Sequence, residues 1–136
     1  MSPIPNPAGG TGPPIEQTIL DQLRREMSAR DVQALPRLED HPIVRQALRG
    51  LSPPAAVVVL SRLRRVIQRA ARAEWLKAWR ASRGLDELAA ARELGLAFED
   101  VQDIEAESIR VRKEAMRPIL DVMKRIRREL RDAPSR

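Results

Sequence analysis

Apolar residues between positions 53 and 83 recur at steps of three and four, and no other feature of the sequence constrains the fold as strongly. Ser52-Pro53-Pro54 is a typical helix start, and Gly84 is a typical helix end. The pattern therefore predicts one long helix from residue 53 to about Ser82, extending roughly 40 Å at about 1.5 Å per residue. Its apolar stripe consists of Ala56, Leu60, Leu63, Ile67, Ala71, Trp75 and Trp79.

Shorter helices are expected on both sides of this segment, because apolar residues keep a helical spacing there. No internal repeat and no convincing strand occurs in the sequence. The expected shorter helices cover residues 15–30, 41–49, 85–94, 98–116 and 119–131.

Capping and helix-breaking residues mark several of these boundaries. Asp40 is expected to cap the helix over 41–49, with Pro42 in its first turn and Gly50 at its exit. Gly95 ends the helix over 85–94. Pro118 is expected to break or kink the chain between the last two helices.

The most abundant residues are strong helix formers, namely Ala, Leu, Arg and Glu, and 32% of the chain is charged. We therefore expect an all-α fold, a helical bundle of about five to six helices with one long central helix. Residues 1–14 are rich in Pro and Gly and predict a disordered tail. A single helical domain over 15–131 and a short basic tail over 132–136 complete the expected organisation.

Charge is sorted into blocks along the sequence. Residues 62–83 contain eight bases and one acid, residues 84–109 contain one base and eight acids, and residues 110–136 contain ten bases and four acids. The first 61 residues hold six of each. Blocks of this size indicate either a basic surface for a polyanion or blocks that neutralise one another within a fold or assembly.

Residues 87–104 resemble a helix-turn-helix unit. That family has a small residue where its two helices cross, and Ala91 stands there. It has a glycine four residues later, where the turn needs a positive φ, and Gly95 stands there. The apolar positions expected between the two helices are occupied by Ala90, Leu94, Leu96, Val101 and Ile104.

The second helix of this unit departs from the family, because it is acidic where the family presents base-reading side chains to the major groove. A phosphate-lined groove would repel these carboxylates. Three interpretations stay open: a descendant that no longer reads DNA, DNA held by flanking basic helices, or a helical corner inside a bundle. In the last case a stripe of acids could lie against the arginines of the long helix. The acids of the second helix are Glu99, Asp100, Asp103, Glu105 and Glu107.

Two basic stretches are the candidate nucleic-acid-binding surfaces. Both favour Arg over Lys, and the guanidinium fork binds phosphate with two hydrogen bonds. The alternative is a solvated helix face, and the last helix could also lie on a membrane surface, although it lacks an aromatic anchor. The candidate residues are Arg62, Arg65, Arg69, Arg72, Arg80, Arg83, Lys124, Arg125, Arg127 and Arg128.

Trp75 and Trp79 lie four residues apart on the apolar face of the long helix. This placement indicates either the core or a subunit interface, where tryptophan is enriched. Stacking on unpaired bases is a weaker alternative, because the chain contains almost no other aromatic residues.

Several kinds of site are not expected. The chain has no Cys and only one His, His41, so the usual zinc ligand sets cannot be assembled. No phosphate-binding glycine loop and no buried carboxylate pair are indicated, so we expect no metal, no cofactor, no small-molecule substrate and no enzyme activity. No apolar run is long enough for a signal peptide or a membrane span, and we expect a soluble cytoplasmic protein.

Together these patterns predict a non-enzymatic nucleic-acid-binding protein that contacts DNA mainly through its phosphates and forms a homo-oligomer. The architecture is similar to small DNA-binding accessory proteins of bacteria and phages, such as the small subunit of phage terminases. That resemblance implies a role in phage packaging or regulation. The alternative is a protein-interaction module whose acidic and basic faces pair with a protein partner or between subunits.

Overall fold

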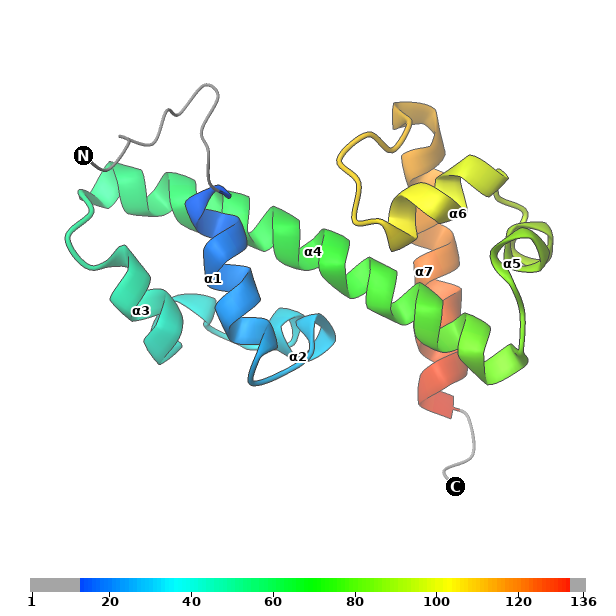
Figure 1. Cartoon of the computed structure of the whole chain (residues 1–136), viewed down its shortest axis with the longest axis horizontal. Coiled ribbons are helices and arrows are strands. Elements are labelled where there is room, and N and C mark those ends of the chain that lie inside the picture. The colour runs from blue at the N-terminus through cyan, green and yellow to red at the C-terminus, as the bar shows by residue number, and fades with distance from the viewer. Residues whose placement is uncertain (1–12, 133–136) are drawn as a thin grey trace. The chain divides into compact units, whose positions relative to one another are not determined.

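A long helix, α4 (Pro53–Arg83), runs through the middle of the chain in the computed structural model, which describes residues 13–132 (Figure 1). Over these residues the fold is all-α, with seven α-helices, two short 3₁₀ helices and no strand. The expected fold class and the expected long helix are therefore confirmed. None of the helices in this described range is both long and apolar enough to cross a membrane.

The chain divides into two compact units within α4, after Ile67. The length of the chain predicted a single helical domain over 15–131. A helix of this length can contribute apolar residues to two separate cores along its axis. We therefore describe each unit by itself.

The first unit contains α1 (Ile15–Arg24), α2 (Ala29–Gln33), a 3₁₀ helix η1 (Leu38–Asp40), α3 (Pro42–Leu48) and the N-terminal part of α4. Helix α1 packs against both α2 and α3. Its residues Ile19, Leu20 and Leu23 are buried, as the spacing of the apolar stripe requires.

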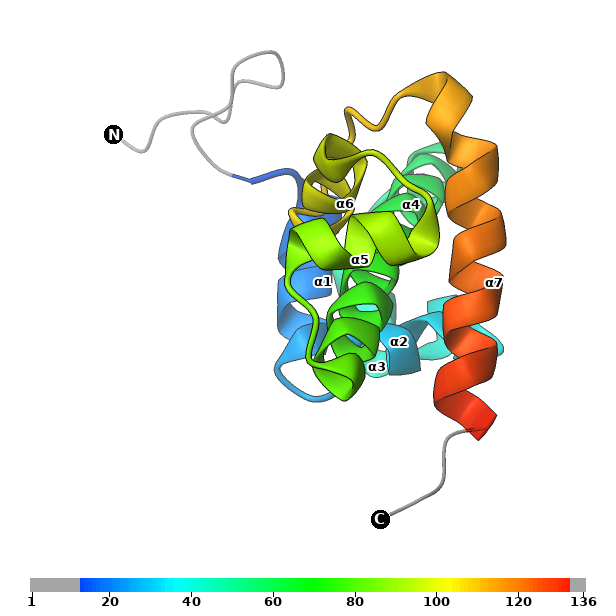
Figure 2. The same ribbon diagram turned by 90° about the vertical axis from the view of Figure 1, so that its right-hand side faces the viewer.

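The second unit contains the C-terminal part of α4 with α5 (Glu87–Leu94), α6 (Phe98–Glu105), a 3₁₀ helix η2 (Lys113–Ala115) and α7 (Met116–Asp132) (Figure 2). All four α-helices contribute to one hydrophobic core. The buried residues of this core are Leu76, Trp79, Ala90, Ala91, Leu94, Val101, Ile104, Ala115, Ile119, Met123 and Ile126.

Helices α5 and α6 form a helical hairpin with the turn expected from the sequence. Gly95 has φ 70°, in the left-handed region. The next amide, Leu96 N–H, donates to the Ala91 carbonyl at 2.9 Å, which closes the C-terminus of α5. Ala91, Val101 and Ile104 are buried in the core, and Leu96 packs against it.

Two of the expected helices end earlier than predicted. The helix over 15–30 is split because Ser28 caps a new helix, its Oγ accepting from Asp31 N–H at 3.1 Å. The helix over 98–116 ends at Glu105, because Glu107 has φ 58° and Ser108 N–H donates to the Asp103 carbonyl at 2.9 Å.

Two boundary residues also act differently from the prediction. Pro118 does not break a helix, because it lies in the first turn of α7. In that turn a backbone N–H would have no acceptor within the helix, so its absence in proline costs nothing. His41, not Asp40, caps α3: its Nδ1 accepts from Ile43 N–H at 3.2 Å. The Asp40 carboxylate lies 3.0 Å from Arg37 instead.

Candidate functional site

The outward-facing side of α7 is strongly basic. Ile119, Met123 and Ile126 are buried, so these three residues define the inner face of the helix. At about 100° per residue, five cations fall within a sector roughly 100° wide that runs from one flank of this inner face to the opposite side of the helix. All are exposed, and none makes an ion pair with an acid on another element of the described chain. They are Arg117, Lys124, Arg127, Arg128 and Arg131.

Apart from Arg64, which pairs with Glu39 at 3.2 Å, the arginines of α4 fall into two groups. In the N-terminal group, Arg62 and Arg65 are exposed, Arg69 and Arg72 are half-buried, and these four have no ion-pair partner within residues 13–132. Burial and the nearby positive charge of Arg69 lower the pKa of Arg72. These arginines therefore carry positive charge that the described residues leave uncompensated.

The C-terminal group, which starts at Arg80, is already paired. Arg80 binds both oxygens of the Glu105 carboxylate: Nε donates to Oε2 at 2.6 Å, and Nη2 donates to Oε1 at 2.7 Å. The third nitrogen, Nη1, donates to the Leu85 carbonyl at 3.1 Å. The bonds to Glu105 are the main cause that raises the pKa of Arg80. Because all three guanidinium nitrogens of Arg80 donate to acceptors within the protein, Arg80 does not belong to the unpaired cations of α4.

The acids of α6 also include members that are paired with arginines. Asp100 and Glu105 are buried, and Asp100 accepts a bond of 2.7 Å from Arg112 in the loop after α6. That bond is the largest cause that raises the pKa of Arg112. Glu99 and Gln102 are exposed. Asp100 and Glu105 therefore tie α6 to Arg112 and to Arg80 of α4.

The sequence contained no signal for the two pairs Arg80–Glu105 and Arg112–Asp100. Their members lie 25 and 12 residues apart, so each pair depends on how the helices pack. One feature of the sequence agrees with the burial of Glu105. Residues 101, 104 and 105 are neighbours on the surface of α6, so a carboxylate at 105 borders the buried apolar residues.

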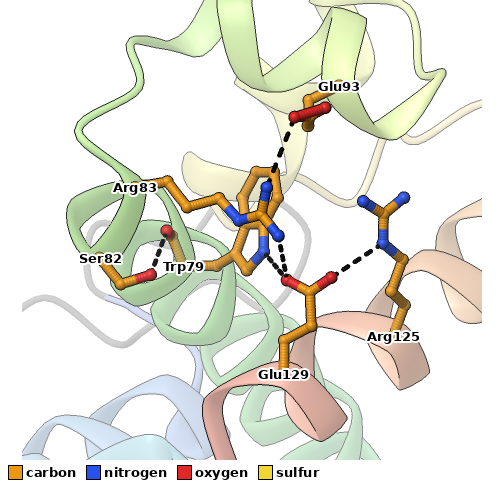
Figure 3. Close-up of polar contacts among 6 residues, drawn as sticks. All are labelled: Trp79, Ser82, Arg83, Glu93, Arg125 and Glu129. Carbon is orange, nitrogen blue, oxygen red and sulfur yellow. Dashed lines mark hydrogen bonds and ion pairs between the residues drawn. The ribbon is translucent and has the colours of Figure 1, made fainter. Parts of the chain in front are cut away.

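A second polar cluster joins α4 to α7 (Figure 3). The Trp79 indole N–H donates to Glu129 Oε2 at 2.7 Å, and Arg83 donates to the same oxygen at 2.8 Å. Arg125 donates to Glu129 Oε1 at 3.2 Å. The Arg83 guanidinium also lies 4.8 Å from the centre of the Trp79 ring and 3.4 Å from Glu93. Three donors therefore converge on one carboxylate.

This convergence acts on the acidity of Glu129. The hydrogen bond from Trp79 is the largest cause that lowers the pKa of Glu129 below the ordinary value. Partial burial opposes this effect, and the bonds from Arg125 and Arg83 reinforce it. Glu129 is therefore held in its charged form.

The predicted interface residues have different positions. Trp79 is completely buried in the core of the second unit, which fits the core alternative of the sequence prediction. It is one of the largest fully buried side chains, and its ring fills the space between α4 and α7. Trp75 is half-buried and packs against the same core.

Within residues 13–132, no group of three or more His, Asp or Glu side chains is arranged to hold a metal ion. His41 serves as the cap of α3. Comparison of the chain with protein-family models, with curated proteins and with solved structures gave no match. The proposals below therefore depend on the geometry and charge of this chain alone.

Proposed function

We propose that this protein binds nucleic acid, most simply duplex DNA, through phosphate contacts made by the outward-facing side of α7. Arg62 and Arg65, which lie in the first unit, are candidate phosphate contacts of their own. The observation that carries the proposal is the separation of the cations into two groups. Arg80, Arg83 and Arg112 are paired with acids, whereas the cations of the outward-facing side of α7 are exposed and have no acid partner on another described element.

The chemistry of this face fits phosphate groups. It is rich in arginine, whose planar fork binds phosphate oxygens with two parallel hydrogen bonds. From Arg117 to Arg131 the face extends about 21 Å along the helix, at about 1.5 Å per residue. This length corresponds to about six base pairs along a duplex, at about 3.4 Å per pair.

The hairpin of α5 and α6 is not assigned a base-reading role. On its second helix Glu99 is exposed and Asp103 is half-buried, and a phosphate-lined groove repels both carboxylates. Contacts limited to phosphates carry little sequence information. We therefore propose binding with modest sequence preference, as expected of an accessory protein in DNA packaging or regulation.

The test is fluorescence anisotropy with a random-sequence duplex, titrated from about 50 to 200 mM salt. Four to five phosphate contacts give an expected slope of log affinity against log salt of about −4, at about −0.9 per contact. The variant Lys124→Glu/Arg128→Glu is expected to lose most of the affinity and to flatten this slope, with its helical content unchanged.

A matched control separates a local site from net charge. The variant Arg49→Glu/Arg92→Glu makes the same change in net charge at exposed positions of α3's C-terminus and of α5. It is expected to retain most of the binding. Equal losses in both variants would mean that only the overall charge matters and would overturn the assignment to α7.

The second candidate function is a protein-interaction module. The exposed Glu99 and the half-buried Asp103 favour it, because their carboxylates can meet a basic partner or a second copy of the chain. In that case the duplex does not bind even at about 50 mM salt, while sedimentation shows an assembly that dissociates when salt is raised. The variant Glu99→Gln/Asp103→Asn then weakens the assembly without affecting the fold.

A further inference from the structure

The cluster of Trp79, Arg83, Arg125 and Glu129 has the chemistry of an anion site that is already occupied. One indole N–H and two guanidinium groups point at a single carboxylate, at 2.7, 2.8 and 3.2 Å (Figure 3). A carboxylate with this set of donors resembles a bound anion in its contacts. Here the anion is a side chain of the protein itself.

Two of the three donors are held in place independently of Glu129. Trp79 is completely buried, so its indole ring cannot turn away. The Arg83 guanidinium lies 4.8 Å from the centre of that ring, a cation–π contact that orients the fork. Arg125 lies one turn before Glu129 on α7, and its exposed side chain bonds to Glu129 itself. Removal of the carboxylate would therefore leave Trp79 and Arg83 in position, with Arg125 within reach of a ligand there.

Space for a ligand lies beside the donors. A pocket of about 430 Å³ opens beside Trp79 and Arg83, and the carboxylates of Glu129 and Asp132 also line it. Asp132, which also contributes to it, is exposed and lies 3.5 Å from Arg131. The residues that line the pocket are Trp79, Ser82, Arg83, Glu129, Leu130 and Asp132.

We propose that Trp79, Arg83 and Arg125 form a phosphate-binding cradle, which the Glu129 carboxylate fills until a phosphate group displaces it. Phosphate offers more acceptor oxygens than a carboxylate and matches the arginine fork, so it can satisfy all three donors at once. Glu129 acts as an intramolecular competitor that weakens binding. The phosphate is either a free anion or part of a nucleic-acid backbone, and only the second source rests on the proposed function.

The first experiment uses the full chain carrying Trp75→Phe, so that fluorescence reports Trp79 alone. Inorganic phosphate is titrated at constant ionic strength, with chloride as the balancing anion. Glu129→Gln removes the competing charge and is expected to raise phosphate affinity about tenfold or more. Arg83→Gln in the Glu129→Gln background is expected to reverse that gain.

Asp121→Asn is the matched control, because it removes one negative charge from an exposed position of the same helix, away from the cradle. It is expected to leave phosphate affinity unchanged. If Glu129→Gln folds poorly, Arg125→Gln removes a donor from the helix surface and is expected to weaken phosphate binding in the native background. A Glu129→Gln protein that binds phosphate no better than Asp121→Asn refutes the cradle.

A parallel titration with duplex DNA identifies the source of the phosphate. Tighter DNA binding by Glu129→Gln than by Asp121→Asn assigns the cradle to the nucleic-acid backbone. A gain for inorganic phosphate alone assigns it to a free anion. Because Lys124→Glu/Arg128→Glu tests the outward-facing side of α7 separately, failure of the cradle and failure of DNA binding give different results.

Discussion

The pair Arg80–Glu105 is expected to be the strongest polar link between α4 and α6. The two hydrogen bonds measure 2.6 and 2.7 Å, and the exposed fractions of the two side chains are 22% and 7%. Breaking a fully buried ion pair by removing one partner destabilises a protein by about 3–5 kcal/mol. Because Arg80 retains some contact with solvent and a glutamine can still accept one bond, we expect Glu105→Gln to lower the free energy of unfolding by about 2 kcal/mol.

The assay is urea unfolding followed by circular dichroism, for Glu105→Gln, Arg80→Gln and the double variant. The coupling free energy between the two positions is expected to be about 2 kcal/mol. The pair Arg83–Glu93 is the control, at 3.4 Å with exposed fractions of 37% and 44%, and its coupling is expected to be below about 0.5 kcal/mol. Equal coupling in the two cycles would refute the argument that burial makes Arg80–Glu105 strong.

Three further predictions concern stability. Gly95→Ala is expected to lower the free energy of unfolding by about 1–2 kcal/mol, because a residue with a side chain disfavours the left-handed backbone conformation. The added Cβ itself meets nothing within 4 Å, so the cost is one of backbone strain. An unchanged urea midpoint would contradict this prediction. Ser28→Ala is expected to lower it by about 1 kcal/mol through loss of the α2 cap, whereas Ser28→Asp, which keeps an acceptor, is expected to preserve it. The third prediction concerns pH, because the pKa of Glu129 is lowered in the folded protein. The stabilisation from the charged Glu129 is fully present above the unfolded-state pKa of about 4.3, and it is lost as pH falls through the lower folded-state pKa. Thermal melts from pH 7 to pH 3 are expected to show a smaller acid-induced loss for Glu129→Gln than for the native chain, and identical profiles would contradict the third prediction.

Local patterns in the sequence predicted much of the secondary structure. The long helix, the left-handed glycine after α5 and the burial of Ala91, Val101 and Ile104 all follow from spacing and backbone preference. The missed helix ends at Ser28 and Glu107 were decided by single hydrogen bonds that compete closely with continuation of the helix. Periodicity does not resolve such small differences in free energy.

The candidate site was less predictable than the helices. Net charge along the chain correctly marked α7 and α4 as basic, but it could not distinguish Arg62 from Arg80, which share one helix and one predicted face. The difference is that a carboxylate from α6 reaches Arg80, while no acid of the described residues reaches Arg62.

The sequence alone determined an all-helical protein with basic and acidic blocks, because helix propensity, periodicity and charge are properties of neighbouring residues. Only the tertiary structure decided which charges are neutralised and which stay available. Ion pairs such as Arg83–Glu129 join residues 46 positions apart, and they form only after α4 and α7 have packed around Trp79. The strength of an electrostatic interaction depends on the partners and the burial that this packing provides.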